Sequence, residues 1–195
     1  MTTIVWPASL IPASADYTPQ YDVRINTPLS GQIDTYGLPG QRWVGTIVIA
    51  TTRNDIKRGA QEALLNSLRG GARTLQAPYF GRMLPNGTLR GTPTLRGAVA
   101  AGASLVPLQN CNGGVRAGDV FGLGGQLLMV DEDASPSGGN MDVKVSPAVR
   151  KPHSAGTAWV WNRPTCPWIP RTPVTFPYRP GRVRPAFSFE LVDIG

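Results

Sequence analysis

One cluster of carboxylates stands out in the sequence: Asp131, Glu132 and Asp133 are consecutive. Adjacent carboxylates are able to serve as acid and base catalysts or to bind calcium. A calcium loop spaces its oxygen ligands along the chain and has a glycine at its sixth position, and neither feature is present here. We therefore expect this cluster to be a solvated turn that follows a strand.

The other nucleophilic or metal-binding side chains are few and scattered. His153 is the only histidine, and the sequence places no nucleophile or orienting acid beside it. Cys111 and Cys166 lack the CxxC spacing of metal sites, so we expect two free thiols, with a disulfide as the alternative. These residue types in this arrangement predict no catalytic residue, no metal site and no cofactor.

Two glycine-containing motifs are expected to form turns. Glycines 118, 122, 124 and 125 surround Asp119, but the residues that follow, 126–130 (QLLMV), have the pattern of a strand. A phosphate-binding loop leads into a helix, so these glycines indicate tight turns and bulges instead. Residues 85–88 (PNGT) have the signature of a tight turn and predict a β-hairpin.

The chain is basic, with 19 Lys and Arg against 12 Asp and Glu and a formal charge of +7. No acidic residue occurs between Val143 and Ser188. Arginines interleaved with aromatic rings are typical of surfaces that bind single-stranded nucleic acid. The prolines of this region, however, hold it extended, and its rings are equally suited to packing on a neighbouring subunit, so we do not expect nucleic acid to be the main partner. The aromatic residues concerned are Trp159, Trp161, Trp168, Phe176 and Tyr178.

Composition favours strands and loops over helices. The 195 residues are 41% hydrophobic and 16% charged, and they include 23 Gly and 19 Pro. This length allows no more than about two small domains, and the abundant turn residues disfavour long helices. The predicted fold class is mainly β: a β-sandwich with one flanking α-helix, a small inserted β-barrel or β-sandwich domain, and extended proline-rich arms.

One strand and one helix are expected to define the main domain. Residues 42–52 (RWVGTIVIATT) form the strongest strand pattern, and apolar residues on both of its faces predict that both are covered. Residues 54–69 predict the helix, which a polar cap begins and Gly70-Gly71 ends. Its expected apolar face consists of Ile56, Ala60, Ala63, Leu64 and Leu68. The predicted core consists of Trp43, Ile47, Ile49, Leu64, Leu68, Phe187, Phe189 and Leu191.

The second half of the chain predicts an inserted domain. Short strands are expected over 95–99, 104–108, 120–130, 141–145 and 157–161, a spacing typical of a small barrel or sandwich. Residues 162–185 contain seven prolines, too many for a central strand, and predict a linker. The alternating strand that follows has to pair with an existing sheet. We therefore expect 93–163 to be inserted into a discontinuous domain of 23–92 and 164–195.

The N-terminal residues are expected to form an extended arm. Residues 1–22 are rich in Pro, Ser and Ala with scattered aromatics, a composition typical of a segment that docks on a partner. No apolar stretch is long enough to cross a bilayer, so no membrane span is expected. The first residues also lack the pattern of a secretory signal, which predicts folding in a cytoplasm.

Two groups of short motifs occur in order along the chain. The first consists of Arg42-Trp43, SLRG at 67–70 and APYF at 77–80; the second consists of AGDVF at 117–121, Val130-Asp131, Gly138-Gly139 and VSPAVR at 145–150. The first group resembles distal tail proteins of tailed phages, which join the tail tube to the tail tip in long, non-contractile tails. The second is similar to a module inserted in many phage tail proteins, and the strand at 187–191 resembles the usual closing strand.

The resemblance implies a virion structural protein without enzymatic activity. It implies a homo-oligomeric, hexameric ring at the distal end of the tail, assembled in the host cytoplasm, with the tail tube protein and tail tip or hub proteins as partners. A closed ring needs a heterologous interface, and arms that reach across to the next subunit would provide it. The candidate interface residues are Trp6, Arg69, Trp168, Arg171, Phe176, Tyr178 and Arg182.

Three alternatives stay open. The chain could be a basic module that binds single-stranded nucleic acid, or another minor tail or adaptor protein. A third alternative is a hydrolase of host surface polymers, which would need the Asp131–Asp133 carboxylates to line a cleft.

Overall fold

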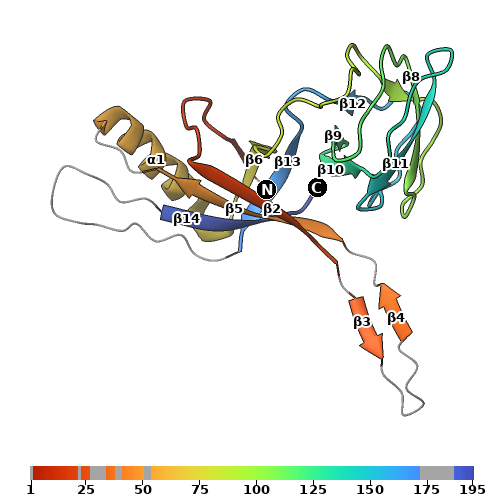
Figure 1. The fold of residues 1–195 in the computed structure, drawn as a ribbon. Helices are drawn as coiled ribbons and strands as arrows, with labels where there is room; N and C mark the ends of the chain where they lie inside the picture. Colours follow the sequence, from red (N-terminus) through yellow and green to blue (C-terminus); the bar gives the residue numbers. More distant parts are fainter. Residues whose placement is uncertain (1, 22, 27–33, 38–40, 51–53, 172–186) are drawn as a thin grey trace.

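The computed structural model describes residues 2–21, 23–26, 34–37, 41–50, 54–171 and 187–195. Within these residues the protein has two six-stranded sheets, one two-stranded sheet and one α-helix (Figure 1). The second six-stranded sheet curls into a nearly closed barrel. This architecture confirms the predicted mainly-β class with a single helix and a barrel-like second domain.

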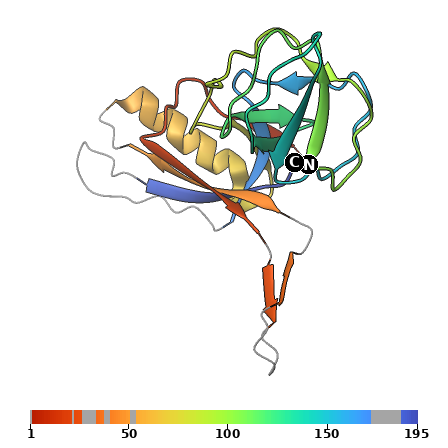
Figure 2. The ribbon, with the colours of Figure 1, turned by 45° about the vertical axis from the view of Figure 1, so that its right-hand side comes forward.

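The first sheet is built from both ends of the chain. Its strand order is β1-β6-β13-β14-β5-β2, in which β1 pairs parallel with β6 and the other pairs are antiparallel. Helix α1 lies across one face of this sheet (Figure 2). The strands are β1 (Thr3–Val5), β2 (Ser14–Gln20), β5 (Arg42–Ile49), β6 (Thr74–Pro78), β13 (Thr165–Pro170) and β14 (Phe187–Asp193).

Helix α1 (Asp55–Leu68) begins and ends at the predicted signals. The Asn54 side chain accepts a hydrogen bond from the Lys57 backbone N–H at 3.0 Å, so it supplies the N-cap. At the other end Arg69 is left-handed, with φ 46°, and the short 3-10 turn η1 (Arg69–Gly71) follows. The apolar face was predicted incorrectly at its start: Ile56 is 85% exposed.

One continuous apolar core fills the space between α1 and the first sheet. The helix contributes Leu64, Leu65 and Leu68 to it. The residues predicted for this core lie buried within it, apart from Phe187, whose side chain is outside the described part of the structure. The buried ones are Trp43, Ile47, Ile49, Leu64, Leu68, Phe189 and Leu191.

Within the described residues, strand β5 is fully covered on one face only, contrary to the prediction. Trp43, Ile47 and Ile49 face the core, whereas Val44 and Val48 on the opposite face are half-buried. The half-buried face is also apolar in sequence because valine fits the pleated surface of a strand even when it is not fully buried. Apolar residues on the outer face of an antiparallel sheet therefore do not by themselves indicate a covering layer.

The N-terminal segment is part of the first sheet, which corrects the prediction of an extended arm over 1–22. β1 and β2 form the two edges of the sheet, and Trp6 between them is only 6% exposed. The Trp6 ring lies 5.1 Å from the Phe80 ring and 6.3 Å from the Phe189 ring, centroid to centroid. Pro19 is compatible with β2 because an edge strand tolerates a missing N–H.

The first part of the linker predicted over 162–185 contains a strand, β13, which corrects the prediction there; residues 172–185 lie outside the described part of the chain. β13 lies inside the sheet between β6 and β14 and contains Pro167 and Pro170. Pro167 of β13 lies beside the end of β14. Its carbonyl accepts the Ile194 N–H at 3.0 Å, so it still makes a hydrogen bond there although it has no N–H of its own. Counting prolines failed here because a proline is excluded only where its missing N–H is needed for the ladder.

The second sheet takes all its strands from the middle of the chain, in the order β12-β9-β10-β11-β8-β7. Leu95 N–H donates to Thr157 O at 2.9 Å and Trp159 N–H to Pro93 O at 3.0 Å, which brings the two edges together. The predicted strand over 120–130 is divided by a turn at Gly124 and Gly125, with φ 56° and 89°. The strands are β7 (Thr94–Leu95), β8 (Leu105–Gln109), β9 (Val120–Leu123), β10 (Gln126–Val130), β11 (Met141–Ser146) and β12 (Trp159–Val160).

A two-stranded ribbon extends away from both sheets. Strands β3 (Val23–Asn26) and β4 (Asp34–Gly37) pair antiparallel; β3 follows the end of β2, and β4 precedes the start of β5 (Figure 1). In both views the ribbon points away from the helix and the barrel (Figures 1 and 2).

Candidate functional site

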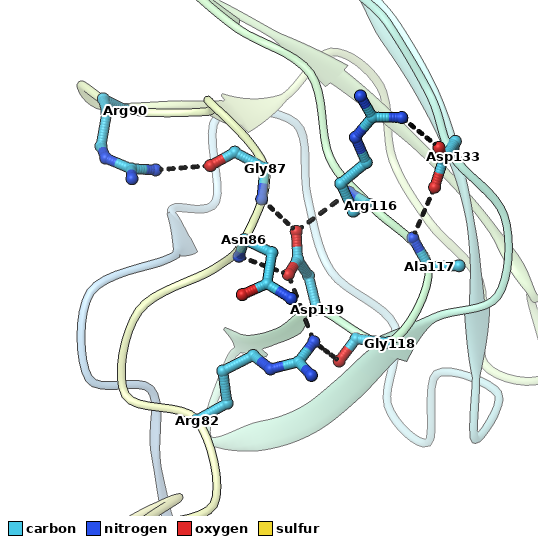
Figure 3. Close-up of polar contacts among 9 residues, drawn as sticks. All are labelled: Arg82, Asn86, Gly87, Arg90, Arg116, Ala117, Gly118, Asp119 and Asp133. Atoms are coloured by element: carbon cyan, nitrogen blue, oxygen red, sulfur yellow. Dashed lines mark hydrogen bonds and ion pairs between the residues drawn. The ribbon is translucent and has the colours of Figure 1, made fainter.

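Asp119 is the centre of a buried polar network in the barrel (Figure 3). Its carboxylate has no exposure, and it accepts backbone N–H bonds from Asn86 at 2.7 Å, Gly87 at 3.0 Å and Arg116 at 2.9 Å. The Arg82 guanidinium lies 3.6 Å from the same carboxylate. This buried negative charge is therefore compensated by three dipoles and one cation.

The Asp119 network replaces the predicted hairpin at 85–88. No strand flanks this turn within the described residues, because the backbone donors of Asn86 and Gly87 are taken by Asp119 rather than by a partner strand. A Cβ at Gly87 would lie 2.5 Å from Gly114 O and 2.9 Å from Asp119 Oδ2. The glycine is thus required by close packing against the barrel, a need that the turn signature alone does not reveal.

Arg90 and Trp161 fix the next part of the same segment. Arg90 Nη1 donates to Gly87 O at 3.0 Å and to Leu89 O at 2.6 Å, and its guanidinium lies 5.1 Å from the centroid of the Trp161 ring. Trp161 Nε1 donates to Gly91 O at 2.7 Å. These contacts occupy both side chains within the molecule.

The Asp131–Asp133 cluster is exposed, and its carboxylates form separate surface contacts. Asp133 pairs with Arg116 and accepts the Ala117 N–H at 2.8 Å, and these bonds, the backbone one foremost, lower the pKa of Asp133. Glu132 pairs with Lys144 at 2.6 Å, and Asp131 accepts the Ser146 hydroxyl at 2.9 Å. Each carboxylate thus makes its own contact at the surface of the barrel.

The histidine and the cysteines lie apart. His153 is half-buried against the Gly124 turn, and burial, with Lys151 nearby, lowers its pKa. Cys111 and Cys166 are free thiols in different cores, and burial raises the pKa of both. In the described part of the chain, no group of three His, Cys, Asp or Glu residues is placed to hold a metal ion.

A buried polar contact joins the barrel to the first sheet. Arg150, which follows β11, donates to the Asp193 carboxylate at the end of β14 at 2.5 Å. Asp193 has no exposure and also accepts the Gly195 N–H at 2.9 Å. Gln126 holds the Arg150 backbone N–H at 2.8 Å. We refer to this contact between Arg150 and Asp193 as the seam.

A tryptophan provides a second connection between the two sheets. Trp43 Nε1 donates to Leu127 O at 3.0 Å, and Val120 and Leu127 of the barrel are part of the first sheet's core. Sequence reasoning placed Trp43 in a core but did not identify its indole N–H as a link to the barrel. No local pattern signals it, because the two residues are 84 positions apart.

The predicted interface residues lie in different environments. Trp168 has no exposure and donates from Nε1 to Ala77 O at 3.2 Å, and Trp6 donates from Nε1 to Leu10 O at 2.6 Å. Both are core residues, which corrects their assignment to an interface: large aromatic rings gain the most from burial within their own chain. Arg171 pairs with Glu190 at 3.1 Å, and Arg69 is exposed. Phe176, Tyr178 and Arg182 lie outside the described residues.

The outer face of the first sheet carries a groove of about 580 Å³. Strands β2, β5 and β14 form its floor, and its walls include Asp16, Glu190 and Arg171. Val44 and Thr46 of β5 and Tyr21 at the base of the ribbon also line it. The groove thus lies on the face opposite to α1 and continues to the start of the ribbon.

No helix in the described residues has the length and apolar character needed to cross a membrane. No protein-family model matches the chain, and no match was found among characterised proteins.

Proposed function

We propose that this protein is a structural subunit of a phage tail, and that copies of it form a ring that joins the tail tube to the tail tip. The order of the motifs along the chain supports this proposal. The observation that carries it is that one molecule has both a projecting ribbon and a sheet face that the described residues leave only half-buried. Both are surfaces that a monomer leaves unsatisfied and that an assembly is able to cover.

The rest of the molecule is suited to bearing load between such contacts. The seam and the Trp43–Leu127 hydrogen bond hold the barrel against the first sheet. The charges of the barrel are committed to its own turns through Asp119, Asp133 and Glu132. A subunit of this kind keeps its shape while its ribbon and open face contact neighbours.

The test is the mass of the purified chain by light scattering over a concentration series, followed by negative-stain microscopy. We expect closed rings of about six copies, alone or after addition of the tail tube protein. A chain that stays monomeric under both conditions would contradict the proposal.

Binding to single-stranded nucleic acid is a second candidate, favoured by the formal charge of +7. The structure weakens its stacking argument, since Trp159 and Trp168 are buried and Trp161 lies under Arg90. Binding assays with a labelled oligonucleotide over a salt series distinguish the two. A nucleic-acid module gives log K falling linearly with log salt from micromolar or tighter affinity, whereas a tail subunit gives only weak, nonspecific binding.

A further inference from the structure

We propose that Asn112 of the folded protein deamidates spontaneously, through attack by the Gly113 backbone nitrogen. The second Asn-Gly pair of the sequence, Asn86-Gly87, is protected from the same reaction by Asp119. Asn-Gly is the dipeptide in which the reaction meets the least steric hindrance, because glycine has no side chain beside the attacking nitrogen. The inference concerns the chemistry of the barrel and does not depend on whether copies of the chain assemble.

The reaction needs only water and its hydroxide. The glycine nitrogen loses its proton to hydroxide and forms a bond to the asparagine Cγ, and negative charge collects on Oδ1. The Cγ–Nδ2 bond then breaks, and the leaving nitrogen takes a proton from water, which releases ammonia and restores the hydroxide. Water opens the resulting cyclic imide at either of its carbonyls. The products are aspartate and isoaspartate, and in isoaspartate the main chain runs through the side-chain carbon.

The Asn112 side chain is placed to react. Asn112 is exposed, so water and hydroxide reach it. Its Oδ1 accepts the Arg90 backbone N–H at 2.8 Å, and a donor at this distance stabilises the negative charge that develops on the oxygen. Among the described residues, the Gly113 N–H has no acceptor, so no hydrogen bond has to break before this nitrogen loses its proton.

The Asn86-Gly87 pair has the opposite arrangement (Figure 3). Asn86 is exposed as well, so exposure alone does not distinguish the two pairs. The Gly87 N–H, however, donates to the unexposed Asp119 carboxylate at 3.0 Å. Removal of this proton would place a negative nitrogen beside a negative carboxylate, which Coulomb repulsion disfavours. The same carboxylate holds the Asn86 N–H at 2.7 Å, so the backbone is fixed on both sides of the Asn86 Cα.

Close packing explains why both dipeptides need glycine and what the modification changes. A Cβ at Gly113 would overlap the Thr88 carbonyl oxygen, and a Cβ at Gly87 would lie 2.5 Å from Gly114 O. Isoaspartate at 112 lengthens the main chain before Gly113 by one atom, and the contact with Thr88 leaves Gly113 no room to shift in that direction. The isoaspartate form should therefore be less stable than the aspartate form.

The first test measures both pairs in one sample of the purified chain. The protein is incubated at mildly alkaline pH, and trypsin then separates the two pairs into peptides 83–90 and 97–116, whose deamidated forms are quantified by mass spectrometry. In the folded chain we expect deamidation to be faster at Asn112 than at Asn86 by about tenfold or more. In urea, where neither the Arg90 nor the Asp119 contact exists, the two rates should be similar.

Asn112→Gln is the matched control, because a glutamine forms the larger imide ring much more slowly. It should abolish deamidation at position 112 and leave the rate at Asn86 unchanged. Equal rates at the two pairs of the folded chain, or a faster reaction at Asn86, would overturn the proposal. So would a folded chain in which neither pair reacts over a time in which both react in urea.

A second test removes the charge that protects Asn86. Asp119→Asn keeps the shape of the side chain, and the incubation is carried out below the melting temperature of the variant. We expect the rate at Asn86 to rise towards that at Asn112, while the rate at Asn112 stays the same. An unchanged rate at Asn86 in the folded variant would show that Asp119 is not the protecting group. If the variant does not fold, the comparison of the two pairs in the wild type decides.

The third test compares two products that carry the same charge. The isoaspartate form is isolated by chromatography from an aged sample, and its thermal unfolding is compared with that of Asn112→Asp. We expect the isoaspartate form to melt at a lower temperature, because only its main chain is lengthened. Identical melting of the two forms would show that the packing of Gly113 against Thr88 tolerates the modification.

Discussion

The barrel and the first sheet differ in how much of their strand edges and faces they bury. The barrel brings its edges together, and it buries one core of its own with Asp119 as an internal polar centre. Among the described residues, the first sheet ends in two edge strands, β1 and β2, that have no further partner strand, and one of its faces is half-buried. The two sheets have the same number of strands but differ in how much of their strand edges and faces stays accessible to other molecules.

The difference indicates a division of roles within one chain. A closed barrel removes unpaired strand edges and is stable by itself, while a sheet with an open face and a projecting ribbon is suited to contacts with other chains. The seam joins the two parts through a buried ion pair. Substitutions in the barrel should therefore change stability, and substitutions on the ribbon should change assembly.

The largest effect is expected from Asp119→Ala, which removes the polar centre of the barrel. Three backbone N–H groups and the Arg82 guanidinium lose their carboxylate partner inside the protein. The free energy of unfolding should fall by about 3–5 kcal/mol, measured by urea denaturation followed by tryptophan fluorescence.

The control for Asp119→Ala is Asp142→Ala, which removes an exposed pair with Arg96. It should change the free energy of unfolding by less than about 0.5 kcal/mol. Equal losses in the two variants would mean that Asp119 does not organise the barrel.

Arg150→Met tests the connection between the two regions. The variant removes the cation that pairs with the unexposed Asp193 carboxylate and leaves it the Gly195 N–H bond. We expect the free energy of unfolding to fall by about 2–4 kcal/mol. Because the seam couples the two parts, calorimetry should also resolve two unfolding steps in this variant. Adding Asp193→Asn should restore part of the loss, and a purely additive double variant would show that the two side chains do not interact.

Alkaline pH distinguishes the two cores through their cysteines. Burial raises the pKa of Cys166 in the folded chain well above the ordinary value of 9.0, at which the unfolded thiol titrates. Below that pH the thiol is protonated in both the folded and the unfolded chain, so its contribution to the free energy of unfolding is fully present there. As pH rises above about 9, only the unfolded thiol loses its proton, and the free energy of unfolding should fall with a slope approaching 1.4 kcal/mol per pH unit.

Cys166→Ala should flatten that slope between pH 9 and 10, as measured by urea denaturation at each pH. Cys111→Ala is the comparison in the barrel core, where burial also raises the pKa but less strongly. It should flatten the slope less. An identical pH dependence in the wild type and Cys166→Ala would show that the thiol is not protected from solvent in the folded state.

The smallest effect is expected from Lys144→Ala on the outside of the barrel. Glu132 is the main cause of the raised pKa of Lys144, but both side chains are exposed, and salt screens such a pair. The melting temperature should be unchanged at physiological salt. A clear decrease there would show that this exposed pair contributes measurably to the stability of the barrel.

Local signals predicted the elements whose stabilising contacts are close in sequence. Helix α1 has its cap in Asn54, and the predicted terminator, Gly70-Gly71, follows directly after the left-handed Arg69, so its boundaries could be predicted from the local sequence. The turn at Gly124-Gly125 is similarly local. Positions with one clear apolar alternation, such as Trp43 and Ile47, were also placed in a core.

Local signals failed where distant residues decide the outcome. The strand at Pro167 is stable because β6 and β14 flank it and the end of β14 needs only its carbonyl. The expected hairpin at Asn86-Gly87 does not form because Asp119, 33 and 32 positions away, takes both N–H groups. Trp6 was read as an arm residue because its ring contacts, Phe80 and Phe189, are far along the chain.

The sequence by itself determined the mainly-β class, the single helix with its caps, and the short strands of the barrel, because composition, periodicity and turn residues act over a few positions. Tertiary structure alone decided which face of β5 is covered, which prolines lie within a sheet, and which carboxylate holds the barrel together. Those outcomes depend on burial and hydrogen bonding between segments far apart in the chain, and a charge such as that of Asp119 becomes structural only when folding removes it from water.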